Sequence, residues 1–591
     1  MENKNIYVGH RYVPKIIGVH DSSQAYEGLS IVTHEGTSYT SKKYVPEGVC
    51  ITNEEFWVVT GNYNVQVEHY RNEVNQIKKS QDNIISEISD VKTNHDDLKT
   101  DYEKSKVKLN NLSYGIFNVL DYNMTIDGET DNTNEFNTII NDISENGGGI
   151  LEIPYHENEI IISDSLNLPS NITINGNGNT IKSKSTSNET TPFYFTNKEN
   201  IVIENVKIDG MKELKDNQQS VTGGSNGITF TNQCKNIIIS NCHIYNTLEH
   251  GIHFLSRVSD DGKRVEHCEN IVVENCLFEN NGNKYWHVGN RGAGIMCFNG
   301  AINIKIVNNT FKDFVAVGAY IDSAYNTKER LENLYPLIKV DNDEYMGDNV
   351  IVTGNTFLMT VDHWTNNPSN TGVGIVLHGQ KNVIVSNNII RLDKGNYRGI
   401  SISAGQEVSN TRNIIVEGNN VLSTSFTIEV TSSKEIYIMN NKLKSINEYV
   451  IVTRSLSKSY SDIFIINNII TNENTRHGVY IENTSDEFTL DNIYVKDNII
   501  TLKEEGNVNA CIFVFGKCEF AEVKNNIVKL GKYGIRVDSK VKKVNITSNV
   551  IKNADTGVYA TGIGVVAFNT ILDCVRPLGL NTIQDQYNVT E

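Results

Sequence analysis

The sequence predicts a mainly β protein whose larger part is a parallel β-helix, preceded by a coiled-coil stalk and a small N-terminal β module. Three patterns predict this fold class. Apolar and polar residues alternate around aromatics in residues 1–66, and apolar residues recur with a period of 3.5 over 67–113. Beyond them, units of the form Asn-Ile-x-[Ile/Val]-x-x-Asn recur, as in Asn382–Asp393 (NVIVSNNIIRLD).

Charge and composition exclude several classes of function. The 591 residues carry a formal net charge of -18, which disfavours nucleic acid or an anionic surface as the main partner. The first residues, MENKNIYVGH, lack the regions of a signal peptide, and no apolar run is long enough to span a membrane. We therefore expect a chain that is made in a cytoplasm, is not exported by the usual route and does not insert into membranes.

The cysteines are expected to be structural and reduced. There are nine, an odd number, and the pairs Cys234/Cys268 and Cys242/Cys276 have the same separation of 34 residues. Such pairs lie at matching points of a repeat, which favours stacked, buried thiols over a disulfide framework.

The aromatic-rich segment 1–66 is expected to form a small meander of short strands around Gly28 and Gly36. It resembles compact modules, similar to chitin-binding domains, that occur on bacteriophage tail and appendage proteins. Two interpretations stay open. Trp57 and its neighbours bind sugar, or the aromatics form the core of a module that docks to the virion. We favour docking.

Residues 67–113 are expected to form a stalk of about 70 Å. Eleven of the fourteen a and d positions are apolar or aromatic over seven heptads, which predicts a coiled coil. β-branched residues at the d positions Ile77, Ile84 and Val91 favour a homotrimer over a dimer.

Residues 114–165 contain a short strand, a turn, an amphipathic helix and a triple glycine before a new strand. This stretch resembles the entry segment of the pectate-lyase superfamily as it occurs in phage tailspikes and preneck appendage (tail fibre) proteins. The matching residues are Asp127, Gly128, Asp131, Asn132, Thr133 and Gly147–Gly149. The sequence departs from the family pattern at Asn123 and at Pro154–His156. The resemblance implies that 114–165 caps a right-handed parallel β-helix (pectate-lyase-like) formed by 166–591.

The repeat itself predicts a solenoid, because two alternating strands recur with a period of 22–34 residues and turns too short for crossover helices. We expect each corner asparagine, such as Asn388, to adopt a left-handed backbone and to hydrogen-bond to the amide one rung away. The second strand of each unit starts at a glycine, as in GAYID from Gly318 and GIVLH from Gly374. These asparagines are interpreted as structural.

Irregular rungs between Asn241 and Asn388 mark the expected site. Inserted segments at 256–268, 279–292, 323–348 and 361–372 would wall a groove whose floor is the outward face of GAYID. Alternation turns Tyr320 and Asp322 outward and puts Asp322 beside His378 on the next rung, within reach of a hydrogen bond. A carboxylate beside an imidazole can act as a general base or as two metal ligands.

The candidate residues fall into two groups. The catalytic candidates are Asp322, His378, Asp313, Asp362 and His253, and the substrate-binding candidates are Tyr320, Trp286, Trp364, His287, His363 and Arg291. Exposed aromatics beside polar groups suit stacking on sugar rings. No cluster with zinc-ligand spacing occurs, no metal ligand is assigned, and a divalent cation such as Ca²⁺ stays open as a cofactor.

The order of the parts resembles a phage tail fibre, tailspike or preneck appendage of a phage that infects a low-GC Gram-positive host. The resemblance implies a virion protein, assembled in the host cytoplasm, that binds host teichoic acid or capsular polysaccharide and attaches to other tail proteins through its N-terminal module. Three hypotheses follow: hydrolysis of teichoic-acid phosphodiesters, which is favoured, depolymerisation of capsule through paired carboxylates, and receptor binding without catalysis.

Overall fold

The computed structural model describes residues 14–62, 102, 105–215, 225–262, 264–283, 292–323, 346–363, 371–404, 411–454, 460–483, 485, 487–503, 509–538, 540–561, 564–581, 584–586 and 588–590. The chain divides into two compact units, Met1–Glu103 and Lys104–Glu591, which are described separately. Among the described helices, none combines the length and hydropathy needed to cross a membrane.

The N-terminal unit is a four-stranded sheet in the order β1-β2-β3-β4. The strands are β1 (Lys15–Val19), β2 (Ser30–His34), β3 (Thr37–Ser41) and β4 (Trp57–Asn62). Trp57 is buried against Tyr26, Val32 and Val45. The tryptophan therefore belongs to the core of the unit, which leaves its ring no free face for a sugar.

Most of the predicted coiled coil, and with it the trimer prediction, lies outside the described residues. Residues 105–112, at its end, are helical and belong to the larger unit. There Asn111 Nδ2 donates to Thr173 Oγ1 at 3.1 Å, and Lys108 pairs with Glu204.

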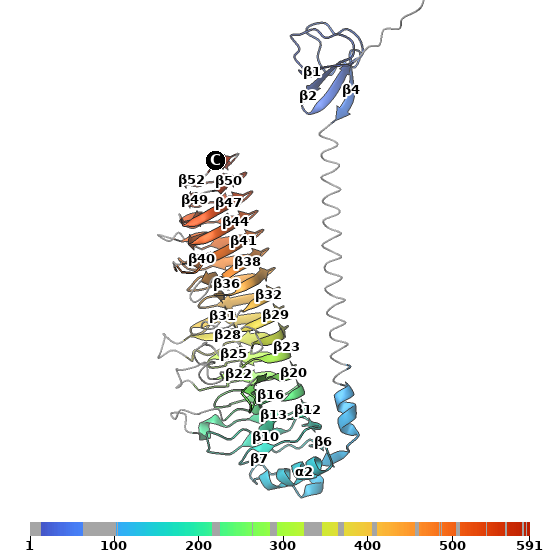
Figure 1. Ribbon diagram of the computed structural model, residues 1–591, viewed down its shortest axis with the longest axis vertical. Helices are drawn as coiled ribbons and strands as arrows, with labels where there is room; N and C mark the ends of the chain where they lie inside the picture. Colours follow the sequence, from blue (N-terminus) through green and yellow to red (C-terminus); the bar gives the residue numbers. More distant parts are fainter. Residues whose placement is uncertain are drawn as a thin grey trace, which may run out of the picture. The chain divides into compact units, whose positions relative to one another are not determined.

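The start of the larger unit is a cap. It contains β5 (Ile116–Asn118), the 3-10 helix η1 (Val119–Tyr122), α2 (Thr133–Glu145) and β6 (Gly149–Glu152). Asp127 closes the predicted turn, since its carboxylate accepts hydrogen bonds from the backbone N–H groups of Glu129 and Thr130, which hold its pKa at about 2. The apolar face of α2 is buried, and α2 covers the end of the coil (Figure 1).

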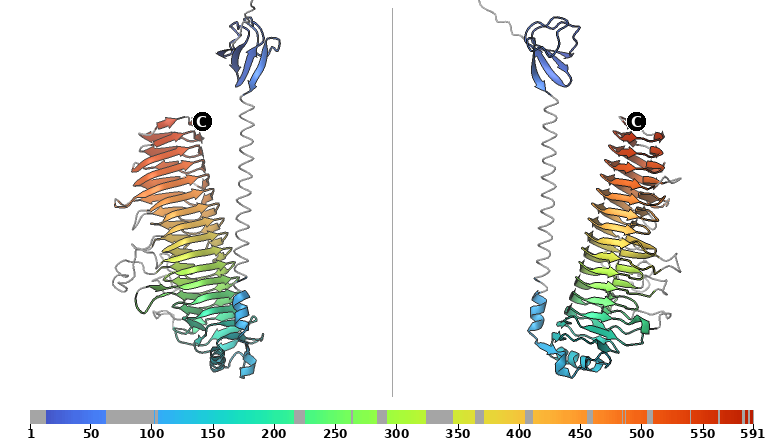
Figure 2. Two further views of the ribbon diagram at one scale, coloured as in Figure 1. Left: turned by 45° about the vertical axis from the view of Figure 1, so that its right-hand side comes forward. Right: turned by 180° about the vertical axis from the view of Figure 1, so that it is seen from behind.

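Beyond the cap, each turn of the chain adds one strand to each of three parallel sheets, and the rungs stack along one axis (Figures 1 and 2). The corner between sheets 1 and 2 carries the ladder asparagine.

Sheet 1 contains β5, β6, β9 (Ile172–Asn175), β12 (Glu199–Glu204), β15 (Lys235–Ser240), β20 (Cys268–Glu274), β23 (Ala301–Val307), β26 (Gly347–Thr353), β29 (Gln380–Ser386), β32 (Arg412–Glu417), β35 (Lys434–Met439), β38 (Tyr460–Ile466), β41 (Leu490–Lys496), β44 (Cys518–Lys524), β47 (Val541–Thr547), β50 (Gly564–Ala567) and β53 (Gln584–Gln586).

Sheet 2 contains β7 (Ile160–Ile162), β10 (Thr180–Ser183), β13 (Lys207–Asp209), β16 (His243–Tyr245), β21 (Leu277–Glu279), β24 (Thr310–Lys312), β27 (Thr356–Leu358), β30 (Ile389–Leu392), β33 (Asn420–Ser423), β36 (Lys442–Ser445), β39 (Ile469–Asn472), β42 (Ile499–Leu502), β45 (Ile527–Lys529), β48 (Val550–Lys552), β51 (Thr570–Leu572) and β54 (Val589–Thr590).

Sheet 3 contains β8 (Leu166–Asn167), β11 (Phe193–Thr196), β14 (Ile228–Thr231), β17 (Ile252–Leu255), β22 (Ala293–Phe298), β25 (Val317–Asp322), β28 (Gly372–His378), β31 (Tyr397–Ser403), β34 (Ile428–Thr431), β37 (Ile451–Arg454), β40 (Val479–Asn483), β43 (Ala510–Gly516), β46 (Tyr533–Val537), β49 (Thr556–Thr561) and β52 (Arg576–Asn581). Outside the sheets lie η2 (Lys212–Leu214) and the hairpin of β18 (Arg257–Val258) and β19 (Val265–Glu266).

The interior is a continuous column of Ile, Val, Leu and Phe side chains. Rings stack from rung to rung, as in Phe278, Phe311 and Phe357, whose centroids lie 5.0 and 4.6 Å apart. A Cβ on Gly318 would lie 2.5 Å from the Phe357 ring, so glycine at the start of the sheet 3 strand makes room for this stack.

The asparagine ladder is confirmed. Asn388 Nδ2 donates to Asn419 Oδ1 at 2.9 Å and to the carbonyl of Val352 on its other side, and the same pattern links the corner asparagines from Asn309 to Asn588. On earlier rungs Cys242 and Cys276 occupy this position. All nine cysteines are free thiols, as predicted.

Two details of the repeat differ from expectation. Each turn has three strands rather than two. The asparagine corner is so tight that the two strands beside it form a single apolar alternation in the sequence, which predicts one strand. The left-handed residue is the one before the ladder asparagine, such as Asn387 with a φ of 55°. Asn388 itself is not left-handed, since its side chain must point inward to join the ladder.

Candidate functional site

The expected floor of the site forms on sheet 3. Ala319 and Ile321 point into the core, so Tyr320 and Asp322 of β25 face outward. Asp322 is paired with His378 of β28 on the next rung, as the alternation predicted. His253 of β17 is in the column of Tyr320, two rungs earlier.

Tyr320 joins the acid and the imidazole. Its hydroxyl lies 3.1 Å from Asp322 Oδ2 and 3.2 Å from His378 Nδ1. Asp322 Oδ1 and His378 Nδ1 are 3.9 Å apart, which is too far for a hydrogen bond. The direct contact expected from the sequence is therefore replaced by a tyrosine bridge, because side chains on adjacent rungs stand about 4.8 Å apart.

Burial sets the protonation of this triad. It raises the pKa of Asp322 to about 7, against a smaller lowering by the Tyr320 hydrogen bond. It lowers the pKa of His378 to about 4, and the nearby positive charge of Arg398 adds to this lowering. The Asp322 side chain is 4% exposed and that of His378 is 24% exposed, so the imidazole is the member that solvent reaches.

Because a hydroxyl has one proton, the triad has two hydrogen-bonding arrangements. In one, ionised Asp322 accepts from Tyr320, which accepts from His378 Nδ1–H, leaving Nε2 as a base. In the other, protonated Asp322 donates to Tyr320, which donates to Nδ1, and Nε2 then holds a proton. A triad that can present His378 Nε2 either with or without a proton suits acid–base chemistry near pH 7.

His253 lies in a separate buried cluster. Its Nδ1 is 3.4 Å from Asn226 Nδ2, and its ring is tilted against that of His250 with centroids 5.1 Å apart. Burial lowers its pKa to about 4, so the ring is neutral at pH 7. The structure does not bring His253 into contact with Tyr320, since Met296 stands between them in the column.

The carboxylate of Asp313 is engaged in the turn after β24. Its Oδ1 accepts from Thr360 N–H at 2.6 Å and its Oδ2 from Thr360 Oγ1 at 2.7 Å. His363 Nε2 is 2.9 Å from the Asp313 carbonyl, and burial lowers the His363 pKa. Asp362, which directly precedes His363 in this loop, is exposed. Trp286, His287, Arg291 and Trp364, and most of the inserted segments, lie outside the described residues.

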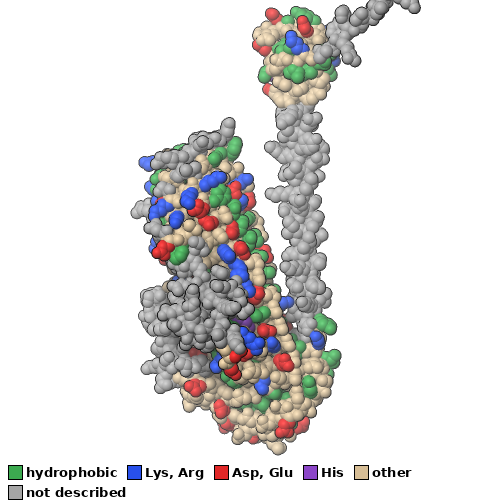
Figure 3. Space-filling model, viewed as in Figure 1, with side chains coloured by type: hydrophobic (Ala, Val, Ile, Leu, Met, Phe, Trp, Pro, Cys, Tyr) green, Lys and Arg blue, Asp and Glu red, His purple; other side chains and the backbone are tan. Residues whose placement is uncertain are grey.

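The next rungs of sheet 3 add charged groups that sequence reasoning missed. Arg398 of β31 pairs with Glu429 of β34 at 2.5 Å, and Arg454 of β37 contacts both Glu429 and Glu482. Charges of both signs are interspersed on the visible face of the later rungs (Figure 3). The alternation in YRGISIS places Arg398 outward. Arg398 is in register with Val373, and Ser403 is the residue beside His378, so Arg398 acts on the imidazole through its charge.

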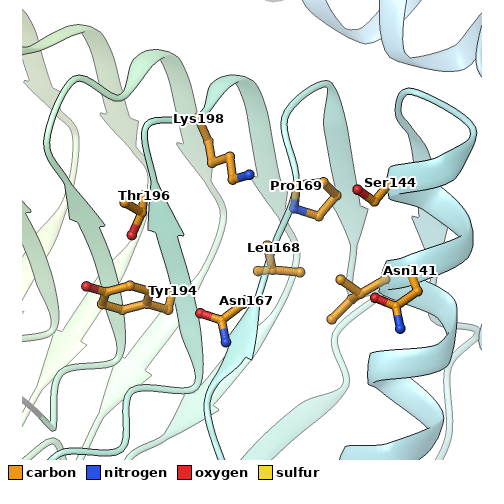
Figure 4. A pocket seen from close by; sticks show the side chains of 9 residues that line it. Asn141, Ser144, Asn167, Leu168, Pro169, Tyr194, Thr196 and Lys198 are labelled. Atoms are coloured by element: carbon orange, nitrogen blue, oxygen red, sulfur yellow. The ribbon is translucent and has the colours of Figure 1, made fainter.

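A hollow lies near the cap. A cavity of about 280 Å³ opens between α2 and the sheet 3 strands β8 and β11, with Tyr194 and Lys198 on one side and Asn141 and Ser144 on the other (Figure 4). None of its nine lining residues is acidic. Over the described part of the chain, no group of three or more His, Cys, Asp or Glu side chains is arranged to hold a metal ion.

Comparisons with known proteins agree with the fold. The family model described as a right handed beta helix region matches residues 103–333. The SPbeta prophage-derived uncharacterized protein YomE of Bacillus subtilis (strain 168) is 25% identical over 319 residues, which are 52% of this chain and 42% of YomE. The chain thus spans less than half of the length of this relative.

Two solved structures of phage proteins are similar at low identity. A mutant tailspike protein of E. coli bacteriophage HK620 has a TM-score of 0.48 and 14% identity, with 77% of this chain and 78% of that chain covered. The N-terminal fragment of gene product 12 of bacteriophage Phi29 has a TM-score of 0.42 and 14% identity, with 79% and 86% covered. The three parallel sheets and the family-model match together identify the larger unit as a right-handed parallel β-helix.

Proposed function

We propose that this chain is a phage tail receptor-binding protein that binds a host cell-wall glycopolymer and hydrolyses it, with teichoic-acid phosphodiesters as the favoured substrate. The observation that carries the proposal is the Tyr320 hydroxyl held between Asp322 and His378 on the outward face of two adjacent rungs. The relative from a prophage supports a phage origin. In this proposal the N-terminal unit docks to other tail proteins and the chain works in the virion.

His378 is the group that acts on the substrate in this mechanism. With Asp322 ionised, Nε2 takes a proton from a water as its oxygen bonds to phosphorus. The bond from phosphorus to the leaving alcohol breaks, and Nε2 returns the proton to that oxygen. Tyr320 and Asp322 are positioning residues that orient the ring and stabilise its positive charge, as in triads that hold an imidazole between a nucleophile and an acid.

The charges around the imidazole favour a phosphodiester over a glycosidic bond. Arg398, which is in register with Val373 and pairs with Glu429, puts a positive charge near His378 that would attract a phosphate group. Glycoside cleavage by the usual route needs two carboxyl groups about 5–10 Å apart. Of the carboxylates predicted beside Asp322, that of Asp313 is already engaged by Thr360. A single imidazole that is base and then acid needs no second carboxylate.

Incubation with purified polymers tests the proposal. The protein is mixed with wall teichoic acid and, separately, with capsular polysaccharide, and phosphomonoesters and reducing ends are measured. We expect phosphomonoester release from teichoic acid, reduced about 10²- to 10⁴-fold by His378→Gln. His243→Gln, on the outward side of sheet 2, is the matched control and should keep the wild-type rate.

The other hypotheses predict different outcomes. Release of reducing ends from capsule alone would identify a depolymerase instead. Binding to host cells without release from either polymer would leave a receptor-binding protein without catalysis. Equal rates for His378→Gln and the control would move the chemistry away from this triad.

A further inference from the structure

The later rungs of sheet 3 carry a strip of aromatic rings on their outward face. We call it the aromatic strip, and its members are Phe426, Tyr449, His477, Tyr480, Phe513, Tyr533 and Tyr559. None of them belongs to the interior core. Their burial varies along the strip, since Phe513 is 6% exposed and Tyr559, the most exposed member, is 38% exposed.

The rings contact one another from rung to rung. Tyr449 stacks between Phe426 and His477, with centroids 5.9 and 5.4 Å apart and planes within 5° of parallel. Further along, Tyr480 and Phe513 have centroids 5.4 Å apart, and those of Tyr533 and Tyr559 lie 5.7 Å apart. Outward aromatic rings with polar neighbours suit stacking against the faces of sugar rings.

Four arginines lie over rings of the aromatic strip, and three of them are paired with carboxylates. The paired ones are Arg398 and Arg454, which contact Glu429, and Arg476, which contacts Glu448. Their charges are balanced within the protein, so they serve the packing of the rungs.

Arg536 is the exception. Its guanidinium lies 4.5 Å from the centre of the Phe513 ring and 4.9 Å from that of the Tyr533 ring. Among the residues that the structure describes, no carboxylate pairs with it and no acceptor takes its N–H groups. The contacts with the rings use the face of the guanidinium, whereas its five N–H donors lie in its plane. A partly exposed guanidinium with free donors fits the paired oxygens of a phosphate or a carboxylate.

The position of Arg536 separates it from the triad. It lies on β46, six rungs beyond His378 on β28, in the outward column that also contains Tyr320. At about 4.8 Å per rung the two groups are about 29 Å apart along the axis. One sugar cannot reach both groups, but one polymer can.

We infer that Arg536 and the rings beside it form a second binding site, which holds a negatively charged sugar unit of the polymer while the triad acts elsewhere on the same molecule. The guanidinium binds the anionic oxygens, and Tyr559, beside Arg536 on the next rung, stacks on the sugar. Binding at two points raises the affinity for long polymers. The inference rests on the proposed function for the identity of the polymer, but binding at Arg536 does not need the triad.

Titration calorimetry of the full-length protein tests the inference. The protein carries His378→Gln, so that the polymer stays intact, and is titrated with purified wall teichoic acid. We expect Arg536→Gln to weaken the affinity about tenfold or more, in the range of a hydrogen bond to a charged group. Arg536→Lys keeps the charge without the paired donors and should recover part of the affinity. Arg391→Gln, at an exposed outward position of β30 on sheet 2, is the matched control and should bind as its parent does.

Small probes identify the anion. Glucose 1-phosphate, glucuronic acid and uncharged methyl glucoside are each observed by ligand-detected NMR in the presence of the same His378→Gln protein. Saturation transfer to glucose 1-phosphate or to glucuronic acid that Arg536→Gln removes would support the site and name its anion. Equal transfer to methyl glucoside would show that the site does not select charge and would overturn the inference.

Two further outcomes would contradict it. One is equal behaviour of Arg536→Gln and its parent toward teichoic acid and toward both charged probes. The other is a loss of affinity with a matching fall in the urea midpoint, neither of which Arg536→Lys restores, because this would assign Arg536 to the stability of the fold.

Hydrolysis by the chain with His378 intact separates this inference from the proposed function. Arg536→Gln should raise KM for long teichoic acid, leave kcat unchanged and leave the cleavage of fragments shorter than about 29 Å unchanged. Equal losses with long and short substrates would place Arg536 in the catalytic site and overturn the inference. Absence of hydrolysis in all variants would refute the proposed function, and the binding measurements would still decide on the second site.

Discussion

The outward faces of sheet 3 and sheet 1 belong to the same rungs and share the same interior, but they carry different chemistry. On sheet 3, Tyr320, Asp322 and His378 bring titratable groups together, and Arg398 and Glu429 follow on later rungs. On sheet 1, aliphatic and aromatic side chains repeat in one column. The scaffold sets the spacing on both faces, and the choice of outward side chain decides what each face can bind.

The difference also shows in regularity. Both sheets pair without interruption, but the inserted segments enter or leave the sheet 3 strands from β17 to β28, where the acid and the imidazole lie. Irregular loops can shape a site for a ligand, whereas a regular row of outward side chains presents a repeated, flat surface.

The largest effect is expected from a mutation in the asparagine ladder, which supports both faces. Asn441→Ala deletes the acceptor of the Asn419 backbone N–H and side-chain amide and the donor to Val416 O. Asn468 Oδ1 also loses its side-chain donor. Four buried polar groups thus lose a partner, so we expect a loss of about 3 kcal/mol or more in the free energy of unfolding. Urea denaturation measures it. The exposed Asn420→Ala is the control and should change stability by less than about 0.5 kcal/mol. Similar losses for both would remove the ladder's structural role.

The second-largest expected effect is a pH dependence of stability that comes from Asp322 on sheet 3. The folded chain holds the Asp322 proton up to pH about 7, but the unfolded chain releases it near pH 3.9, so this group's contribution lowers stability as pH rises through that window. Asp322→Asn escapes this loss and should gain up to ~4 kcal/mol relative to wild type at pH 8, but little at pH 4. Urea midpoints at both pH values measure the difference, in which other groups cancel.

The same variant tests catalysis without disturbing sheet 1. If ionised Asp322 supports the base form of His378, the wild-type rate rises with pH through about 7. The Asp322→Asn variant should then lack this rise in rate. Its mass in solution should equal that of wild type. If Asp322→Asn keeps the rise in rate with pH, the pH dependence belongs to another group.

The smallest effect concerns the bridge. Tyr320→Phe removes the hydroxyl between Asp322 and His378 and keeps the ring, so we expect about a tenfold loss of rate, in the range of a single hydrogen bond to a charged group. Tyr559→Phe, in the same outward column on β49, is the matched control and should be silent. Polymer-cleavage assays stopped at fixed times give the rates of both variants and of wild type.

Much of this arrangement could be predicted from the repeat. Period-two alternation put Tyr320 and Asp322 outward, and the matching positions of successive units put His378 beside Asp322. The tyrosine bridge could not be predicted, because a reach of about 3 Å depends on side-chain conformations and not on register. The engagement of Asp313 by Thr360 was missed for the same reason, since the partner comes from a turn 47 residues further along.

The sequence alone determined the solenoid, its asparagine ladder, its free thiols and the pairing of Asp322 with His378, because a repeat makes equivalent positions neighbours whatever lies between them. Only the tertiary structure decided that each turn has three strands and that Asp322 is buried enough to hold its proton to about pH 7. It also aligned the apolar residues of separate strands into one column on sheet 1. Burial, corner geometry and the sum of many outward positions arise when the rungs stack, and no single unit contains them.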